Sequence, residues 1–536
     1  MSNMTLRFRN LFRAAPQHFD DRLCALLAGL LFGALVMDTA GAQSSNLVRV
    51  SGPSPFADCN VDPLTLTAFG ELNYLNAEVE PFVAVNTRKP EHIVGVWQQD
   101  RFTFGGARGL VTGVSHDGGT SWTRTFPHFS YCAGGTVANG GNYERASDPW
   151  VTVTPNGHVF QIALSFDFVN DANEAVLVSR STDHGNTWSE PTALITDTDP
   201  FVGDDKESIT ADPKHSKFVY AVWDRLQFDT TFPFPEIAGP TWFARTTNGG
   251  DSWEPARVIY DPGLDASTIA NQIAVLPDGT LIDLFVRFLH FNEGTTNPED
   301  VALAIVRSKD RGLTWSAPIV INTVESIGVV DVKNGVFLRT GDVIPNIAVD
   351  RESGTLYVVW QDARFSNHQR DGIVFSKSVD DGLSWSAPVQ VNRVPTVQAF
   401  TPSVDTTEDG AVGVTYYDLR NDTSDPKVLL TDYWQITSKD GGATWHERHR
   451  GGSFDMTTAP ISGGYFVGDY QGLGHQDESF LPFFVMANSG NLSNRTDVFA
   501  PVSEETEDRG REHEEINAMP QSLKERVQSH RERRPH

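Results

Sequence analysis

Charged side chains recur in this sequence where short apolar segments end. Asp100 and Arg101 follow the segment Ile93–Trp97, and Asp224 and Arg225 follow a later segment of the same kind. The arginines in such positions are Arg101, Arg225, Arg364 and Arg420. A guanidinium can hold a substrate carboxylate through two hydrogen bonds, and paired carboxylates suit acid–base chemistry on a glycosidic bond. These residue types favour a funnel lined by arginines and carboxylates.

The same spacing also has a purely structural interpretation. The pattern Trp-x-Asp-x-Arg, as in Trp360–Arg364, recurs in related forms along the chain. An Asp and an Arg two residues apart at a strand end can form ion pairs between neighbouring repeats and thereby orient the loops. Both interpretations stay open at the level of the sequence.

An eight-residue motif organises the elements that must position these side chains. It reads Ser/Thr, any residue, Asp/Asn, any residue, Gly, any residue, Ser/Thr, Trp, and it occurs six times without insertions. The tryptophans are 60 to 70 residues apart, which is typical of a repeat architecture. The acidic or amide members are Asp117, Asp183, Asn248, Asp310, Asp380 and Asp440.

The residues of this box suit a turn. The Asp side chain can accept hydrogen bonds from the backbone of its own loop, and Gly tolerates a positive φ. The Trp offers a large apolar surface for packing against a sheet. The box lacks the closely spaced carboxylates of a Ca²⁺ loop, so we expect its role to be structural.

Short apolar segments surround each box and predict strands. A repeat contains a segment such as Pro345–Val349, a turn, a strongly apolar segment such as Leu356–Trp360, and a third segment that runs into the box. A fourth segment leaves from the Trp, as in Pro388–Asn392. Continuous apolar strands fit sheets buried on both faces, and four short strands per repeat fit a propeller blade. The expected fold class is all-β, a β-propeller of four-stranded antiparallel blades.

The sequence contains seven pairs of first and second strands, one more than the number of boxes. The seventh pair is Tyr465–Val467 with Ser479–Met486, and Arg495–Ala500 supplies a third strand. Leu47–Val50 is similar to the fourth strands elsewhere, so we expect it to complete a seventh blade and close the ring. The alternative is a six-bladed propeller with residues 451–501 as an appendage.

The six boxes match the Asp-box, or BNR, repeat, and residues 47–501 resemble the sialidase-like β-propeller superfamily. This superfamily includes exo-sialidases, other glycosidases and binding propellers without activity. In its members the box lies on the hairpin between the third and fourth strands, on the face away from the ligand. The resemblance implies a ligand site at the opposite ends of the strands.

The resemblance also implies roles for individual residues. Sialidases combine three arginines for the substrate carboxylate, an Asp acid, and a Tyr nucleophile activated by a Glu. By residue type and expected face, Asp100 is the candidate acid, Glu207 the base and Tyr470 the nucleophile. The candidate substrate-binding residues are Arg101, Arg225, Arg364 and Arg420. Sialidases carry an Arg-Ile-Pro motif in the first blade, whereas this chain has Glu80–Val83 there, which weakens the expectation of sialidase activity proper.

The two ends of the chain differ from the repeats. Residues 1–42 combine arginines, the apolar run Leu23–Met37 and a small-residue cleavage pattern, which is typical of a secretion signal. Residues 502–536 are rich in Glu, Arg, Gln and His, and they predict a charged, disordered tail. After cleavage, Cys59 and Cys132 either form one disulfide in an oxidising compartment or stay as two free thiols.

The net charge of −27 argues against nucleic acid as a partner. We expect a secreted monomer, extracellular or periplasmic, with no membrane association after signal cleavage. The implied function is that of a sialidase-like exo-glycosidase acting on glycoconjugates, and the alternative is a propeller that binds a glycan or a protein without catalysis. We expect neither cofactor nor metal, and a divalent ion at Asp204, Asp205 and Asp469 is a weaker alternative.

Overall fold

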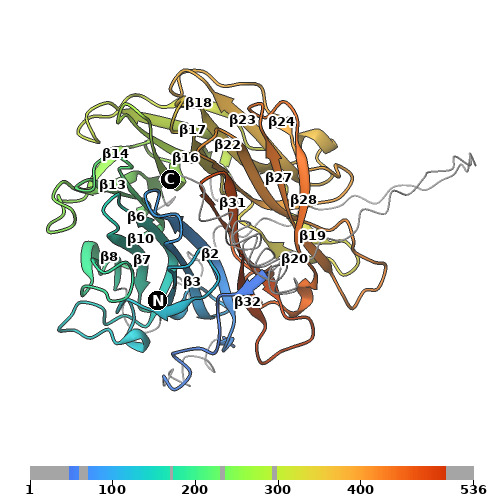
Figure 1. Ribbon diagram of the computed structural model, residues 1–536, viewed down its shortest axis with the longest axis horizontal. Helices are drawn as coiled ribbons and strands as arrows, with labels where there is room; N and C mark the ends of the chain where they lie inside the picture. The colour runs from blue at the N-terminus through green and yellow to red at the C-terminus, as the bar shows by residue number, and fades with distance from the viewer. Residues whose placement is uncertain (1–46, 60–69, 169–172, 230–235, 292–297, 503–536) are drawn as a thin grey trace, which may run out of the picture.

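The computed structural model describes residues 47–59, 70–168, 173–229, 236–291 and 298–502. Strands make up nearly all of its regular structure, which confirms the all-β expectation. The helical elements are the 3-10 turns η1 (Tyr131–Ala133), η2 (Arg364–Ser366) and η3 (Met456–Thr458). The sheets follow one another in chain order around a common centre (Figure 1). The expected secretion signal, and all but the first residue of the expected tail, lie outside the described residues.

Antiparallel units of four strands are the building blocks of the fold. The first unit consists of β2 (Glu78–Val85), β3 (Ile93–Arg101), β4 (Ala107–Ser115) and β5 (Thr123–Thr125). The second consists of β6 (Arg145–Val153), β7 (Val159–Phe166), β8 (Glu174–Ser181) and β9 (Thr192–Asp197). The third consists of β10 (Val202–Ala211), β11 (Val219–Asp229), β13 (Thr241–Thr246) and β14 (Arg257–Tyr260). The fourth unit consists of β15 (Ala266–Val275), β16 (Leu281–Phe291), β17 (Pro298–Ser308) and β18 (Ile319–Thr323). The fifth consists of β21 (Asn346–Val349), β22 (Leu356–Asp362), β23 (Gly372–Ser378) and β24 (Val389–Gln390). The sixth consists of β25 (Ala399–Thr406), β26 (Val412–Asp418), β27 (Leu430–Ser438) and β28 (His446–Asp455).

The last sheet combines both ends of the described chain. It has the order β1 (Leu47–Arg49), β32 (Thr496–Pro501), β31 (Ser479–Ala487), β30 (Gly472–Gln476), and β1 pairs antiparallel with β32. Tyr465–Val467, the predicted first strand, is not in this sheet. The end of the sheet opposite β1 is β30, which packs closely on β2: a Cβ on Gly472 would lie 3.0 Å from Val83 N, and one on Gly474 would lie 3.2 Å from Val85 Cγ2.

The core forms where the second strands of the units are buried on both faces. Every residue of β3, β7, β22 and β26 is buried, as expected for uninterrupted apolar strands between packed sheets. Trp97 of β3, Trp223 of the second strand β11 and Trp360 of β22 are at most 1% exposed. The second strands therefore fix the sheets, and their polar ends are buried as well.

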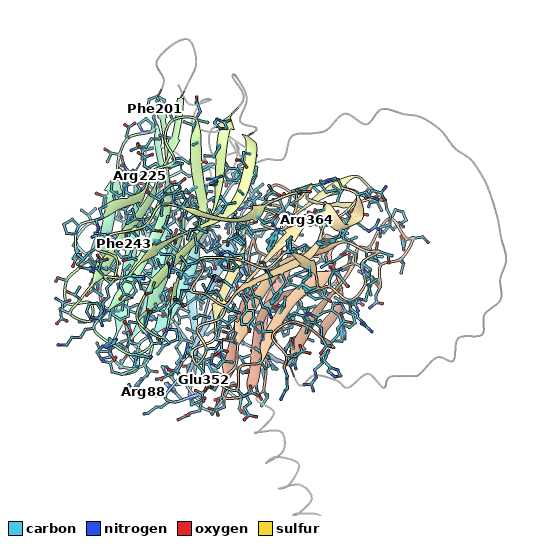
Figure 2. All side chains as sticks on the ribbon, turned by 90° about the horizontal axis from the view of Figure 1, so that it is seen from above. Arg88, Phe201, Arg225, Phe243, Glu352 and Arg364 are labelled. Atoms are coloured by element: carbon cyan, nitrogen blue, oxygen red, sulfur yellow. A yellow bond between two sulfur atoms is a disulfide. The ribbon has the colours of Figure 1, made fainter. Side chains whose placement is uncertain are left out.

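The six boxes form the hairpins between third and fourth strands, and their hydrogen bonds follow a common pattern. In the fifth box, Ser378 Oγ donates to Asp380 Oδ1 (2.8 Å), while Ser384 N and Oγ donate to Asp380 (2.8 and 2.6 Å). The box of the first unit contacts the turn between β2 and β3, since Gly118 N donates to Glu91 O (3.1 Å). Figure 2 shows two such first turns, at Arg88 and Glu352, at the end of the molecule opposite Arg225 and Arg364.

Most first strands carry a β-bulge at the same place. The register shifts after Val79 in β2, and the corresponding strands β6, β10, β15 and β25 shift in the same way. The first residue of each bulge has a φ between 51° and 64°, and these residues are Glu80, Asp148, Lys206, Ala270 and Thr401. A bulge bends the strand and redirects a side chain. Because the bulge recurs at the same place, each of these units directs a side chain from the equivalent position.

An additional hairpin crosses from the middle of the chain to its last part. It consists of β19 (Val329–Asp331) and β20 (Val336–Arg339), and β20 pairs in parallel with β29 (Tyr465–Phe466). A further short strand, β12 (Glu236–Gly239), pairs with β11 and β15 and links their two units. Within the described residues no helix is long and apolar enough to span a membrane.

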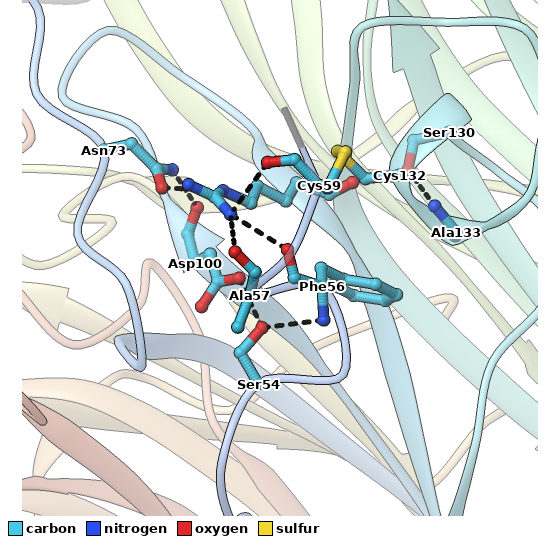
Figure 3. The surroundings of a disulfide bond; sticks show 10 residues. Ser54, Phe56, Ala57, Cys59, Asn73, Asp100, Ser130, Cys132 and Ala133 are labelled. Atoms are coloured by element: carbon cyan, nitrogen blue, oxygen red, sulfur yellow. Dashed lines mark hydrogen bonds between the residues drawn. A yellow bond between two sulfur atoms is a disulfide. The ribbon is translucent and has the colours of Figure 1, made fainter. Parts of the chain in front are cut away.

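A disulfide fastens the N-terminal segment to the first unit (Figure 3). Cys59 and Cys132 are joined, with their Cα atoms 5.4 Å apart. Beside it, Arg108 Nη1 donates to the backbone oxygens of Phe56, Ala57 and Cys59, at 2.9 to 3.3 Å. The segment after β1 is therefore held by one covalent bond and by one guanidinium.

Candidate functional site

Charged side chains from the bulges and the strand ends opposite the boxes form one electrostatically coupled group, here called the inner cluster. It is carried by β2, β3, β6, β10, β11, β20 and the segment before β30. Its members are Glu80, Asp148, Asp205, Lys206, Glu207, Asp224, Asp469, Tyr470, Arg101 and Arg339. The equivalent bulge positions of β15 and β25 hold Ala270 and Thr401, so the charges gather on one arc of the centre.

Asp148 and Asp205 form a hydrogen-bonded carboxyl pair at the heart of the inner cluster. Burial, the neighbouring Asp148 carboxylate and the shared hydrogen bond raise the pKa of Asp205 to about 7. Burial alone would raise the pKa of Asp148 as well, but Lys206, the Ser147 hydroxyl and Arg101 outweigh it and lower that pKa. Two neighbouring carboxyls thus differ in proton affinity, and Asp205 can hold a proton near neutral pH.

The Lys206 ammonium packs on the ring face of Tyr470 beside this carboxyl pair. The Lys206 ammonium lies 3.6 Å from the centroid of the Tyr470 ring and 4.7 Å from that of Trp150. The Tyr470 hydroxyl donates to Pro149 O (3.1 Å). Burial, followed by the carboxylates of Glu80, Asp148, Glu207 and Asp469, raises the pKa of Tyr470 well above its ordinary value. This environment opposes ionisation of the phenol.

Glu207 is completely buried in the bulge of β10. Neither oxygen of its carboxyl accepts a hydrogen bond from another residue in the described ranges. Burial and the Asp148 carboxylate raise the pKa of Glu207 well above the usual value. Asp224, whose pKa burial and Asp205 also raise, accepts a hydrogen bond from Ala270 N (3.2 Å). The cluster therefore combines carboxyl groups whose pKa is raised with Asp148, whose pKa is lowered.

Arg101 enters the cluster from the end of β3. Its Nη1 donates to Gln98 Oε1 (2.6 Å), its Nη2 donates to Ser462 Oγ (3.1 Å), and its Nε has no partner among the described residues. Gln98 in turn donates to the Glu80 carboxyl. Burial and repulsion by Asp148 raise the pKa of Glu80. Glu80 is thus a buried acid of the site.

Asp100 lies in a different set of contacts, beside the N-terminal segment (Figure 3). Its carboxylate accepts hydrogen bonds from Ser54 Oγ (2.5 Å) and Asn76 N (2.8 Å), and its own φ is 67°. The structure therefore gives Asp100 the partners of a loop-fixing residue. Of the three candidate catalytic residues, Glu207 and Tyr470 belong to the inner cluster and Asp100 does not.

Each of the other three candidate arginines binds a carboxylate of its own unit, and Arg225 also binds Asp197 at the end of β9 in the preceding unit. Arg225 pairs with Asp204 (2.9 Å) and Asp197, Arg364 with Asp362 (2.7 Å), and Arg420 with Asp418 (2.6 Å) and Glu447 (2.7 Å). An indole N–H completes each arrangement: Trp223 bonds Asp204, Trp360 bonds Asp362, and Trp434 bonds Asp418, at 2.9 to 3.0 Å. This repetition agrees with the structural interpretation of the Trp-Asp-Arg pattern. Most of these ion pairs form within a unit, and the pair Arg225–Asp197 joins two neighbouring units.

Three members of the cluster carry roles that residue type alone did not assign. Asp148 and Lys206 occupy bulge positions, and Arg339 comes from the additional hairpin. A polar residue before a buried first strand was the available signal for the first two. The weaker alternative of a metal at Asp204, Asp205 and Asp469 finds no support, since no group of three potential metal ligands occurs within the described ranges.

Comparison with known proteins agrees with the repeat motif. Residues 241–460 match the family model described as a BNR repeat-like domain. This match confirms the resemblance to the sialidase-like proteins with Asp-box repeats. No curated protein matches the sequence.

Several solved structures follow a similar course of the chain. A protein of unknown function from Dyadobacter fermentans has a TM-score of 0.43 and 16% identity, covering 67% of this chain and 95% of its own. The GH93 α-L-arabinofuranosidase of Fusarium graminearum with arabinobiose has a TM-score of 0.40 and 14% identity, over 65% and 89%. The NanB sialidase from Streptococcus pneumoniae has a TM-score of 0.40 and 12% identity, over 68% and 69%.

Proposed function

We propose that this chain, whose residues 241–460 form a BNR repeat-like domain, is a secreted exo-glycosidase with the inner cluster as its active site. The observation that carries the proposal is the Asp148–Asp205 pair, in which one carboxyl keeps its proton near neutral pH. Hydrolysis of a glycosidic bond needs a group that protonates the leaving oxygen as the C–O bond breaks. Asp205 is that acid in the proposal, and it replaces Asp100 in this role.

Asp148 then acts through Asp205. The two carboxyl groups of a glycosidase act from opposite sides of the sugar and are separated by roughly 5 to 9.5 Å, whereas Asp148 is directly hydrogen-bonded to Asp205. The carboxylate of Asp148 instead keeps the proton on Asp205. Lys206 and Ser147 in turn keep Asp148 ionised.

Glu207 and Tyr470 keep the roles of base and nucleophile in the proposal, which requires Glu207 first to release to solvent the proton that burial favours on it. Tyr470 Oη now donates to Pro149 O, so its hydrogen bond must change before Glu207 can take the phenol proton. The attacking phenolate, or a water molecule deprotonated by Glu207, would form the new bond to the sugar carbon. Asp205 gives its proton to the departing oxygen, and water finally supplies the hydroxyl of the released sugar.

The architecture and location also belong to the proposal. We infer a ring of seven blades in which β1 is the outer strand of the last blade. Support comes from the pairing of β1 with β32 and from the packing of β30, β31 and β32 against β2. Export is supported by the signal pattern of residues 1–42 and by the disulfide, since disulfides persist in oxidising compartments.

The test is turnover of a panel of aryl glycosides, sialosides included, by the purified mature protein. Asp205→Asn is expected to reduce kcat about 100-fold or more, because loss of a general acid typically costs 10²–10⁴ in rate. Asp283→Asn, a change at a buried acid outside the cluster, serves as the matched control with normal kcat. Absence of turnover at high enzyme concentration on every glycoside would refute the proposal.

A non-catalytic binding propeller is the second candidate. It is favoured by the occupied arginines, since Arg225, Arg364 and Arg420 all pair with carboxylates of their own units. Glycan-array binding that survives Glu207→Ala and Tyr470→Ala, without turnover in the unsubstituted protein, would favour this candidate. Turnover that is lost in both variants would favour the glycosidase.

A further inference from the structure

The hairpin β19–β20 is fastened to the last part of the chain by two close backbone contacts. A Cβ on Gly341 would lie 2.1 Å from Asp469 O, and a Cβ on Gly464 would lie 2.3 Å from Phe337 O. Both positions therefore require glycine, and Gly341 also has a φ of +61°. The parallel pairing of Leu338 with Tyr465 adds a short ladder. The sequence thus builds one rigid connection between distant units beside the inner cluster.

This connection delivers a single guanidinium to the cluster. Arg339 Nε donates to both carboxylate oxygens of Asp469 (3.0 Å each), and its guanidinium carbon lies 4.6 Å from the centroid of the Phe466 ring. Arg101 approaches the same ring at 4.9 Å. Arg339 also interacts electrostatically with Glu80, Asp148 and Asp205. It therefore belongs to the site although it lies more than 100 residues from most of the other members.

Exposure distinguishes Arg339 from the other cations of the cluster. Its side chain is 38% exposed, whereas Arg101 is 2% and Lys206 5% exposed. Its Nη1 donates to no residue in the described ranges, while Asp469 holds the opposite edge of the guanidinium. A guanidinium that is held on one edge by a carboxylate and has a free N–H group on the other edge can donate a hydrogen bond to an acceptor oxygen of a ligand.

We propose that the β19–β20 hairpin is a specificity element and that Arg339 is its substrate-contacting residue. The recognised group is an acceptor oxygen of the sugar, either a hydroxyl or a carboxylate. Asp469 is the positioning residue, because it orients the guanidinium without facing the ligand. This inference rests on the proposed function, since it assigns a binding role within the same site.

The test compares Arg339→Ala and Arg339→Lys with the unsubstituted protein. We expect Arg339→Ala to raise KM at least tenfold with little change in kcat and in Tm, and Arg339→Lys to recover only part of the affinity, since Lys cannot hold Asp469 with two donors and also face the substrate. A loss confined to sialosides or uronides identifies a carboxylate, and an equal loss on neutral glycosides identifies a hydroxyl. An unchanged KM on both kinds of substrate would overturn the inference.

A second readout separates recognition from a merely structural role. The positive charge of Arg339 lowers the pKa of Asp205, so Arg339→Ala should move the alkaline limb of kcat/KM to higher pH. Gly341→Ala should raise KM as Arg339→Ala does, because its Cβ would push the hairpin from Asp469. Gly335→Ala is the matched control, as this glycine has a similar φ of +67° and open space around it.

Failure of the two proposals can be told apart. If the unsubstituted protein turns over a glycoside and Arg339→Ala keeps the same KM and pH profile, the inference fails and the proposed function stands. If the unsubstituted protein turns over none of them but binds a sugar in a glycan array, the glycosidase fails. The inference then requires that Arg339→Ala weaken this binding at least tenfold. If no sugar is bound or cleaved, both proposals fall.

Discussion

At the scale of single residues, the inner cluster separates two carboxyls by charge and hydrogen bonding. Asp205 is the member with a pKa of about 7, raised first by burial and then by Asp148. Asp148 stays ionised because Lys206, Ser147 and Arg101 stabilise its charge. Lys206 has its own support from the faces of Tyr470 and Trp150. The acid of the proposed reaction thus depends on neighbours contributed by three different units.

Asp148→Asn should therefore change the pH dependence of activity. The substitution removes a negative charge that opposes ionisation of Asp205, while burial persists, so the pKa of Asp205 should fall below about 7. Because the protonated form is the proposed acid, the alkaline limb of kcat/KM against pH should move down by roughly one unit. A limb that stays in place would show that Asp205 is not the acid.

Glu207→Gln should stabilise the fold, increasingly so at higher pH. The folded-state pKa of Glu207 is raised, so the native state binds a proton that the unfolded state releases above pH ~4.5. The stability of the unsubstituted protein therefore declines as pH rises, and a neutral amide of the same shape avoids this decline. Urea unfolding at pH 5 and pH 9 measures the difference. Asp283→Asn should stabilise in the same way, since burial raises the pKa of Asp283 too, and should leave turnover intact.

At the scale of elements, the box has a recognisable sequence motif and the bulge has none. Each box repeats its Ser, Asp, Gly and Trp because its hydrogen bonds are local, between residues two to four apart. The bulge is one extra residue in a first strand, and it is occupied by Glu80, Asp148 or Lys206 without a common residue type. The turn face was therefore readable in the sequence, whereas no shared residue type marks the bulge positions.

Replacing a box carboxylate should cost stability in a graded way. Asp380→Ala removes the acceptor of Ser378 Oγ, Ser384 N and Ser384 Oγ, and we expect a loss of about 1–2 kcal/mol in the free energy of unfolding. Asp380→Asn should cost less, because Asn248 keeps the same three partners in the third box, with its Nδ2 donating to Ser252 Oγ instead of accepting from it. Those hydrogen bonds lower the pKa of Asp380 to about 2, so its contribution is lost as pH falls from about 4 towards 2. Equal losses for the two variants would contradict this account.

At the scale of the whole molecule, contacts between distant segments decide where the chain begins and ends in space. Ser51 Oγ donates to Asp497 Oδ1 (2.7 Å), and Val50 N donates to Val498 O (2.8 Å). The disulfide then holds the following segment on the first unit. The N-terminal strand thus pairs with the last strand of the chain, and the segment that follows it is joined to the first unit.

Removal of the disulfide should destabilise the whole fold without changing its chemistry. Cys59→Ser with Cys132→Ser frees a loop that spans 73 residues and should cost about 2–4 kcal/mol in thermal or urea unfolding. The reference is the unsubstituted protein under reducing conditions, which should show the same loss. The kcat of the folded variant should stay normal, because neither cysteine contacts the inner cluster. A variant of unaltered stability would show that Arg108 and the β1–β32 ladder hold the segment unaided.

Sequence alone determined the all-β class, the repeat, the turn role of the six boxes and the face on which chemistry was sought. These features rest on local periodicity and on hydrogen bonds between near neighbours, which a linear pattern records. Only the tertiary structure decided that Asp148 pairs with Asp205, that Asp100 fixes a loop and that Arg339 joins the site. These assignments arise from bulges, from a crossing hairpin and from charges brought together across units, and none leaves a regular spacing in the chain.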